Sequence, residues 1–152
     1  MSGFKGFTIN LIPAVKADLE ALVDLRITAM RESLERIGRF DPVRARERLV
    51  SGFLPNCTKH IAINGKRIGF VVVKPEADHF VLDHFYLHPD QQKKGIGSAV
   101  LNLIFAKVDA QSAALHVSAL RGSAANQFYK RRGFELFDEE EWDLHYVRYP
   151  RR

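Results

Sequence analysis

The sequence predicts one α/β domain, in which helices and strands alternate along the chain. Its 152 residues are 46% hydrophobic, which is enough to bury the core of one ordinary domain. The spacing of apolar residues indicates the order strand, two helices, three strands, helix, strand, helix and two strands. No internal repeat, low-complexity segment or flexible linker occurs, so residues 1–152 are predicted to fold as a single domain.

The N-terminal part predicts a strand followed by a helix. The run "FTINLI" (7–12) alternates and stops at Pro13, as a strand does. Apolar residues then recur at helical spacing over residues 14–30. They are Val15, Leu19, Leu22, Val23, Ile27 and Met30. Arg26 lies within this stripe, where its side chain must either extend its charged end into solvent or reach a buried anion or polar ligand.

A second helix and a hairpin are predicted next. Asp41 as N-cap and Pro42 at the first helical position favour a helix that begins there, with its charges on a solvated face. The segment "HIAINGKRIGFVVV" (60–73) contains two β-rich runs on either side of Asn64 and Gly65. Both turn residues tolerate the positive φ of a type I′ turn, so two antiparallel strands are expected.

The following strand is predicted to lie in the centre of the sheet. The run "FVLDHFYL" (80–87) is apolar on both alternating faces, which is typical of a strand covered on both sides. Beyond a glycine-containing turn, apolar residues form one helical face through residues 96–109. They are Ile96, Val100, Leu103, Ile104 and Val108.

The C-terminal third predicts a strand, a helix and two more strands. Residues 113–120 are expected to form a strand, and residues 124–132 a short helix that ends at Gly133. The final strands are expected at residues 134–137 and 142–149.

The turn within "QQKKGIGSAV" (91–100) has the composition of an anion site. A strand that leads into a glycine-rich turn and then a helix directs backbone N–H groups and the positive end of the helix dipole at one point. Gly95 and Gly97 allow close approach, and Lys93 and Lys94 add positive charge. Neither the Walker A pattern nor the dinucleotide fingerprint is present, since Val100 stands at the third glycine position. A tight turn with a solvated basic flank is the alternative.

The bulk composition limits the classes of protein that fit. Lys and Arg outnumber Asp and Glu by 23 to 18, a net charge of +5 that suits an anionic ligand. A single cysteine, Cys57, excludes an internal disulfide and suits a reducing compartment. We expect a cytoplasmic protein, because the sequence shows no signal peptide and no run of about 20 apolar residues. No metal site is expected, since His84 and His88 do not share a helical face.

Two motifs resemble those of the GCN5-related N-acetyltransferases (GNAT). The stretch "LHPDQQKKGIGSAVL" is similar to motif A, Q/R-x-x-G-x-G/A, at residues 92–97. The stretch "AANQFYKRRGF" is similar to the later A-x-x-F-Y-x-x-x-G-F signature. Its matching residues are Ala125, Phe128, Tyr129, Gly133 and Phe134. The resemblance covers nearly the whole chain and implies the GNAT fold, a mixed, mostly antiparallel central sheet flanked by helices, with a splayed pair of central parallel strands.

The resemblance also implies a reaction and most of a site. A GNAT enzyme moves the acetyl group of acetyl-CoA, its cosubstrate, to a primary amine by direct attack in a ternary complex. Backbone groups of Phe85, Tyr86 and Leu87 are expected to pair with the pantetheine arm, and Tyr129 to contact the cofactor and act as general acid. The turn is expected to bind the pyrophosphate through Gln92, Lys93, Lys94, Gly95, Ile96, Gly97 and Ser98.

The chain departs from the family pattern at two positions. Gly122 stands where many relatives have a cofactor-binding asparagine, and Ser123 or Asn126 can substitute for it. Val117 stands where many relatives have a glutamate base.

The general base is therefore open. Asp83 ranks first, ahead of His84, His116 and water, because it stands where some relatives of the family have an acidic residue. A carboxylate on an otherwise apolar strand is also costly unless it has a partner. The alternative to a catalytic role is a structural one, in which Asp83 pairs with Arg26 or with a backbone amide. The early helices line the acceptor cleft in this family, which makes Arg26 the candidate for acceptor binding.

Two other functions fit parts of the sequence. A coenzyme A-binding sensor without catalysis would explain the two departures. A basic nucleic-acid-binding module would use "KRR" (130–132) and the C-terminal "RYPRR", but no recognised binding motif supports it. The expected partners are acetyl-CoA and an amine acceptor, a small molecule or a protein amine, and no membrane. The acceptor's identity and the oligomeric state, a homodimer included, are left open.

Overall fold

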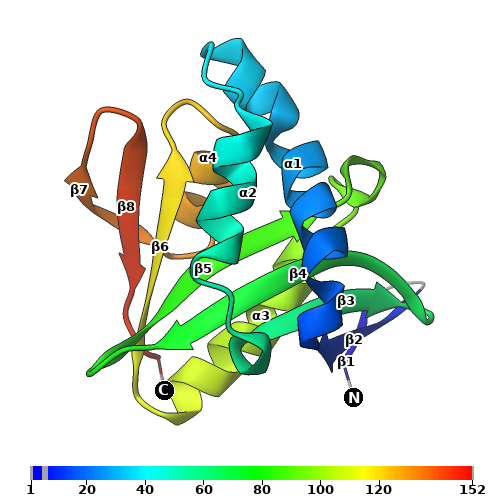
Figure 1. The fold of residues 1–152 in the computed structure, drawn as a ribbon. Coiled ribbons are helices and arrows are strands. Elements are labelled where there is room, and N and C mark those ends of the chain that lie inside the picture. The colour runs from blue at the N-terminus through cyan, green and yellow to red at the C-terminus, as the bar shows by residue number, and fades with distance from the viewer. Residues whose placement is uncertain (1, 5–6, 152) are drawn as a thin grey trace. The chain divides into compact units, whose positions relative to one another are not determined.

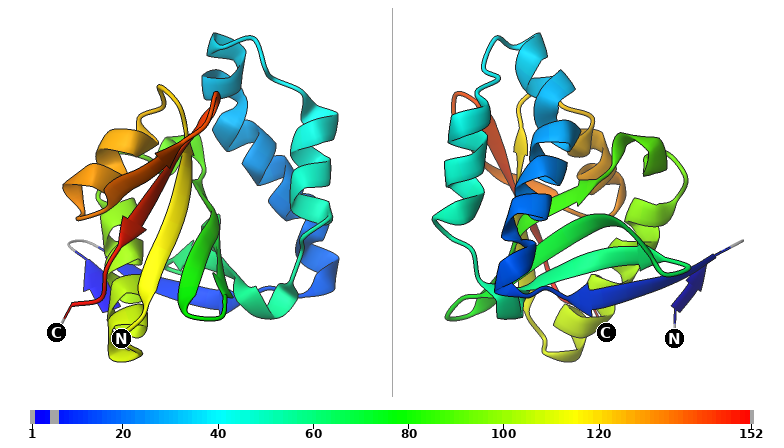
Figure 2. Two further views of the ribbon diagram at one scale, coloured as in Figure 1. Left: turned by 90° about the vertical axis from the view of Figure 1, so that its left-hand side faces the viewer. Right: turned by 45° about the vertical axis from the view of Figure 1, so that its right-hand side comes forward.

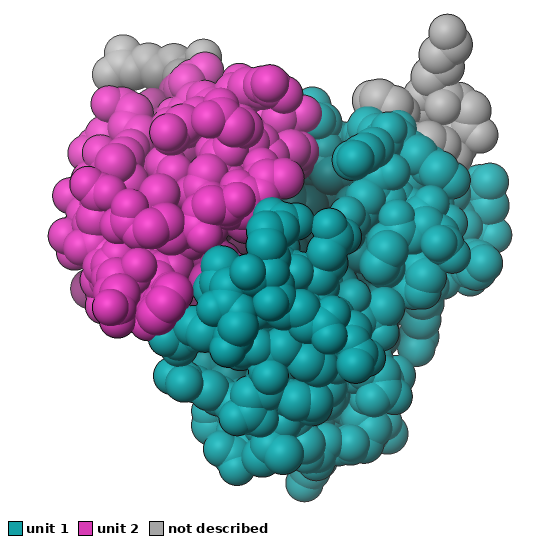
Figure 3. Space-filling model, turned by 90° about the horizontal axis from the view of Figure 1, so that it is seen from above, with its two compact units in different colours: residues 1–72, 84–102 teal, residues 73–83, 103–152 magenta. Residues whose placement is uncertain are grey.

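The computed structural model describes residues 2–4 and 7–151, and the chain forms two compact units (Figure 3). The first unit comprises residues 1–72 and 84–102, and the second comprises residues 73–83 and 103–152. The boundary falls inside two strands and one helix, so no separate linker joins the units.

The strands form a mixed sheet in the order β1-β2-β3-β4-β5-β6-β8-β7. Strands β5 and β6 are parallel, whereas β1–β2, β2–β3, β3–β4, β6–β8 and β7–β8 are antiparallel. The predicted mixed, mostly antiparallel sheet with a central parallel pair is confirmed, and β5 is central as expected. The strands are β1 (Ser2–Phe4), β2 (Phe7–Pro13), β3 (Thr58–Ile63), β4 (Lys66–Pro75), β5 (His79–Leu87), β6 (Ala114–Leu120), β7 (Glu135–Glu139) and β8 (Asp143–Arg148). Strand β1 was not predicted.

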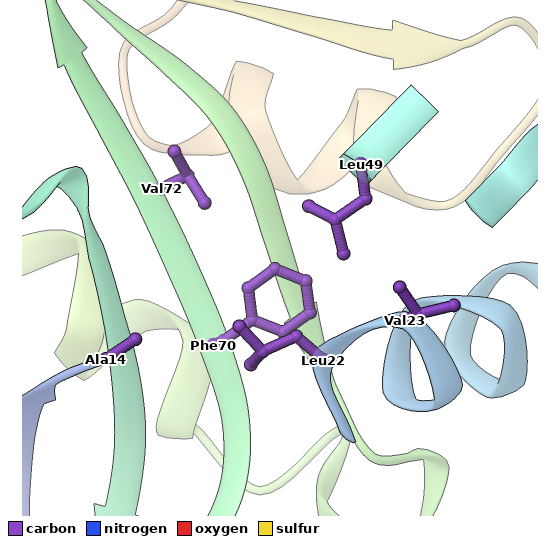
Figure 4. Close-up of a cluster of buried hydrophobic side chains, with 6 residues drawn as sticks. All are labelled: Ala14, Leu22, Val23, Leu49, Phe70 and Val72. Carbon is purple, nitrogen blue, oxygen red and sulfur yellow. The ribbon is translucent and has the colours of Figure 1, made fainter. Parts of the chain in front are cut away.

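In the first unit, helices cover both faces of the strands (Figures 1 and 2). Helices α1 (Leu19–Arg36) and α2 (Pro42–Val50) lie on one face, and the start of α3 (Ile96–Ala110) lies on the other. Figure 4 shows the core between α1, α2 and β4, where Phe70 packs with side chains of both helices. This core consists of Ala14, Leu22, Val23, Leu49, Phe70 and Val72.

Helix α1 is shifted relative to the prediction. It begins at Leu19 rather than residue 14 and continues to Arg36, and Val15 is 58% exposed instead of contributing to the apolar stripe. The reason is Asp18, whose carboxylate accepts hydrogen bonds from the Val15 N–H and His60 Nε2 at 2.9 Å each, after a short 3₁₀ turn. Apolar spacing alone does not register such a side-chain contact between distant residues.

Two turn and cap predictions of the first unit are confirmed. Asp41 accepts hydrogen bonds from the N–H groups of Val43 and Arg44, and α2 begins at Pro42. Asn64 and Gly65 have φ of 50° and 84°, as the type I′ turn between β3 and β4 requires.

The second unit packs α4 (Ala125–Arg131) and the end of α3 against β6 and β8 (Figure 2). Helix α4 ends before Gly133, as predicted. In α3, Leu103 is only half-buried, whereas Leu101 and Phe105 are buried. The other four residues of the predicted face, Ile96, Val100, Ile104 and Val108, are buried, so the prediction is confirmed except at Leu103. Leu101 and Phe105 widen this face, because α3 is apolar around much of its circumference. None of the described helices is long and apolar enough to cross a membrane.

An ion pair ties the C-terminal strand to α3 in the second unit. The Arg148 guanidinium donates to both carboxylate oxygens of Asp109, at 2.8 and 3.0 Å, and stacks 3.9 Å from the Phe105 ring. The hydrogen bond from Arg148 holds the pKa of Asp109 below its ordinary value of 3.8.

Replacing Asp109 by Asn should destabilise the protein by about 2 to 3 kcal/mol, since Arg148 is buried and loses its carboxylate. A carboxyl group whose pKa is lowered by folding stabilises the fold above its unfolded pKa and loses that contribution as the pH falls. Urea unfolding should therefore show a steeper fall in stability below about pH 5 for wild type than for Asp109→Asn. Identical slopes for the two proteins would contradict the assignment.

Candidate functional site

The turn between β5 and α3 has a special backbone conformation. After a 3₁₀ turn at Pro89–Gln91, Lys93 and Gly95 have φ of 63° and 82°. Positive φ at two such closely spaced positions is typical of a turn that directs successive N–H groups toward one concave side. The Gln92 side chain donates to the Leu87 carbonyl at 3.1 Å and holds this turn against the end of β5.

The turn leads directly into the N-terminus of α3. The Ala99 N–H donates to the Gly95 carbonyl at 3.2 Å, which joins the turn to the first turn of the helix. The N–H groups of Ile96 and Gly97 precede it at the start of the helix, where N–H groups have no intrahelical acceptor. Only the backbone of Ile96 can take part in binding, because its side chain is 1% exposed and belongs to the core. The exposed Lys93 and Lys94 side chains complete a positively charged segment that can bind a phosphate.

The end of β5 lies close to β4 in the first unit. A Cβ atom added to Gly69 would lie 2.4 Å from the Tyr86 carbonyl oxygen, so only glycine fits at this position. The His88 N–H donates to the Ile68 carbonyl at 2.8 Å. The register between β5 and β6 runs from His79 opposite Ala114 to Leu82 opposite Val117, and residues 85–87 follow C-terminal to it.

Arg26 of α1 is enclosed in the first unit. The residue is 7% exposed, and its Nη1 donates to the Ala45 carbonyl of α2 at 2.8 Å. The guanidinium carbon lies 5.7 Å from the centre of the Tyr86 ring, on β5. Extension of the charged end into solvent, one of the two sequence alternatives, is wrong, because packing between α1, α2 and β5 encloses the side chain.

Tyr129 and Asn126 lie on α4 in the second unit. Tyr129 is 6% exposed, and its ring centre lies 5.5 Å from that of Phe128 and 5.2 Å from that of Phe134. Asn126 donates to the Leu120 carbonyl at 2.9 Å and accepts from the Tyr146 hydroxyl at 2.7 Å. Because both ends of its amide serve these bonds, Asn126 holds β6, α4 and β8 together, a role that the sequence did not indicate.

The three candidates for proton acceptor are in different surroundings. Asp83 forms an ion pair with Lys74 at 2.9 Å. His84 is 4% exposed in the first unit. His116 stacks on His79 with ring centres 4.0 Å apart, and burial, followed by the nearby charge of His79, lowers the pKa of His116. Among the described residues, no group of three or more His, Cys, Asp or Glu side chains is arranged to hold a metal ion.

The structure also brings together three residues that the sequence analysis missed. Ser118 Oγ lies 2.6 Å from His145 Nδ1, and His145 Nε2 lies 2.5 Å from Glu140 Oε1. Ser118 and His145 are paired across β6 and β8. A hydroxyl, an imidazole and a carboxylate joined in this way can relay a proton. Only the strand register reveals the pair, since 27 positions separate the two residues.

Comparison with protein families gives one match. The family model described as "Acetyltransferase (GNAT) domain" matches residues 55–136, which is more than half of the chain and includes the turn at 92–98 and α4. A comparison with curated protein sequences finds no match.

Solved structures with the same fold include several acetyltransferases. The PaiA N-acetyltransferase from Thermoplasma acidophilum in complex with coenzyme A is 18% identical, with a TM-score of 0.72 over 93% of this chain and 99% of that chain. An acetyltransferase from Thermus thermophilus is 19% identical, with a TM-score of 0.74 over 98% and 99%. The ribosomal-protein-S18-alanine N-acetyltransferase from Escherichia coli is 16% identical, with a TM-score of 0.68 over 93% and 94%. At these identities the likeness shows the fold alone.

Proposed function

The chain belongs to the GNAT acetyltransferase family, and from this premise we propose that it is an N-acetyltransferase that uses acetyl-CoA and a primary amine. The amine attacks the thioester carbonyl directly while both substrates are bound. The nitrogen–carbon bond forms as the carbon–sulfur bond breaks, the amine loses a proton, and coenzyme A leaves as the thiol.

The turn at residues 92–98 is the observation that carries this proposal. Its backbone conformation, with φ of 63° at Lys93 and 82° at Gly95, and its position before α3 suit the pyrophosphate of coenzyme A. The backbone of residues 85–87, beyond the β5–β6 ladder, suits the pantetheine arm, which would add to β5 as a partial strand. Solved relatives in complex with coenzyme A have the same fold, which supports this assignment.

Tyr129 is the proposed general acid. It occupies the tyrosine position of the second GNAT motif, and α4 holds its ring between Phe128 and Phe134. When the carbon–sulfur bond breaks, its hydroxyl would donate a proton to the thiolate of coenzyme A.

Asp83 is the proposed proton acceptor for the amine. An alkylamine has a pKa of about 10, so the attacking form must lose a proton at neutral pH. Asp83→Asn should therefore lower kcat/KM about 10-fold or more at pH 7 and much less near pH 10, with cofactor affinity retained. The pH–rate profile measures this difference.

The ion pair with Lys74 supplies the control for Asp83. Lys74→Met removes the same ion pair but retains the carboxylate. Equal losses in both variants would show that Asp83 acts through structure. Coincident pH–rate profiles of Asp83→Asn and wild type would instead favour His84, His116 or the Ser118–His145–Glu140 set, which His145→Gln tests.

The proposed function is tested by thiol release. The purified protein is mixed with acetyl-CoA and a panel of amines that includes amino acids, polyamines and peptides with free N-termini, and coenzyme A thiol is followed with time. Calorimetry measures acetyl-CoA binding in parallel. Binding together with amine-dependent thiol release is expected. Binding without thiol release above the buffer rate for any amine would identify the alternative, a non-catalytic coenzyme A sensor.

A further inference from the structure

The Arg26 guanidinium is a buried cation without a described counter-ion. Arg26 is 7% exposed, and none of the ion pairs among residues 2–4 and 7–151 includes it. Enclosing a charged group without a partner costs several kcal/mol, so such groups are normally paired with an anion. An external anion would supply what this part of the fold lacks.

Arg148 shows how this chain treats a buried arginine when the role is structural. Arg148 is 5% exposed, similar to Arg26, but both of its Nη atoms donate to the Asp109 carboxylate. By contrast, Arg26 donates from Nη1 to the Ala45 carbonyl and has no carboxylate partner among the described residues. The buried Nε lacks an acceptor in both arginines, so the carboxylate is what distinguishes them. A guanidinium has five N–H donors, so Arg26 has more donors than the Ala45 carbonyl can satisfy.

Arg26 is also next to the proposed cofactor strand within the first unit. Its guanidinium carbon lies 5.7 Å from the ring centre of Tyr86, one of the three residues whose backbone is proposed to bind the pantetheine arm. Tyr86 in turn packs against Phe70, with ring centres 5.5 Å apart, and against the core of α1, α2 and β4. The guanidinium is therefore held in a fixed orientation beside the strand that would carry the acetyl donor.

We propose that Arg26 binds the carboxylate of the acceptor, and that the acceptor is an amino acid whose amine receives the acetyl group. This inference rests on the proposed acetyl transfer. The planar fork of one guanidinium matches the two oxygens of a carboxylate and neutralises its single charge. A phosphate dianion carries two negative charges, and this single arginine would neutralise only one of them. Binding the carboxylate would leave the amine of the same molecule as the end that reacts.

The experiment compares acids with their amides on the coenzyme A-bound protein. Thermal melting is recorded with each of the twenty standard L-amino acids and with the corresponding carboxamide. At least one amino acid should raise the melting temperature of wild type, and its carboxamide should not. Arg26→Met and Arg26→Lys should lose this response, because lysine retains the charge but not the fork. Arg31→Met, which alters an exposed arginine on the same helix, should retain it.

Acetylation of the same compounds separates this inference from the proposed function. KM for the stabilising amino acid should rise about 10²-fold or more in Arg26→Met, as expected when a buried charge pair loses one partner, while acetyl-CoA affinity stays unchanged. If wild type acetylates carboxamides as fast as the acids, the proposed role of Arg26 is overturned but the acetyltransferase activity is not. The same holds if Arg26→Lys prefers the acid over its carboxamide as strongly as wild type does. A carboxylate-specific melting response without thiol release would overturn the acetyltransferase but not the binding role. The absence of a melting response to every amino acid would overturn the inference.

Discussion

Gly97→Glu is expected to lower the affinity for acetyl-CoA by about 10²-fold or more, which corresponds to about 3 kcal/mol. Gly97 lies in the first turn of α3, where the proposed pyrophosphate site consists of backbone N–H groups. A glutamate there adds bulk and a negative charge at the position of the phosphates, and it removes charge-assisted hydrogen bonds worth about 1.5 to 3 kcal/mol each. Isothermal calorimetry with acetyl-CoA measures the change.

The control for Gly97→Glu is a glutamate elsewhere on α3. Ala106 is exposed in the second half of the helix, so Ala106→Glu changes the net charge equally without touching the turn. It should bind acetyl-CoA as wild type does. If both variants retain wild-type affinity, the turn is a solvated basic bend and the cofactor site lies elsewhere.

Tyr129→Phe should lower turnover by about 10²-fold, the lower end for one acid catalyst, because the thiolate that leaves has a pKa of about 8.5 and gains from a proton donor without requiring one. The phenylalanine ring preserves the packing with Phe128 and Phe134, so unfolding should occur at nearly the same temperature. Acetyl-CoA affinity should barely change. Steady-state thiol release, calorimetry and thermal melting together separate these quantities.

Tyr149→Phe provides the matched control, because Tyr149 is 59% exposed near the C-terminus and loses the same hydroxyl. It should turn over at the wild-type rate. A folded Tyr129→Phe protein that also acetylates at the wild-type rate would assign protonation of the thiolate to water or to another donor.

The parts of the fold that were predicted correctly depend on local signals. Asp41 caps α2 through hydrogen bonds to residues two and three positions away, and Asn64 and Gly65 meet the φ requirement of their own turn. The turn before α3 was also predictable from neighbouring residues, because its lysines and glycines lie within one short segment of the sequence. Where a signal came from a distant residue, the prediction was wrong, as at the start of α1, where His60 on β3 contacts Asp18.

The same difference between local and distant signals applies to the candidate site. The residues of the turn and Tyr129 were found from two motifs, each of which lies within one short segment. Contacts between segments were missed, since neither the Lys74–Asp83 ion pair nor the Ser118–His145–Glu140 set follows a sequence spacing. The sequence left two alternatives for Arg26, and packing between α1, α2 and β5 decided between them.

By itself, the sequence determined the order of elements, the mixed α/β class, the family and the glycine-containing turn before α3, because hydrophobic periodicity, capping and turn chemistry act over a few neighbouring residues. Only the tertiary structure decided which charged side chains are enclosed and which of them have partners. Burial and pairing depend on strand register and on helices packing from elsewhere in the chain. For that reason the motifs indicate the acetyl donor, whereas the proposal for the acceptor depends on a single buried arginine.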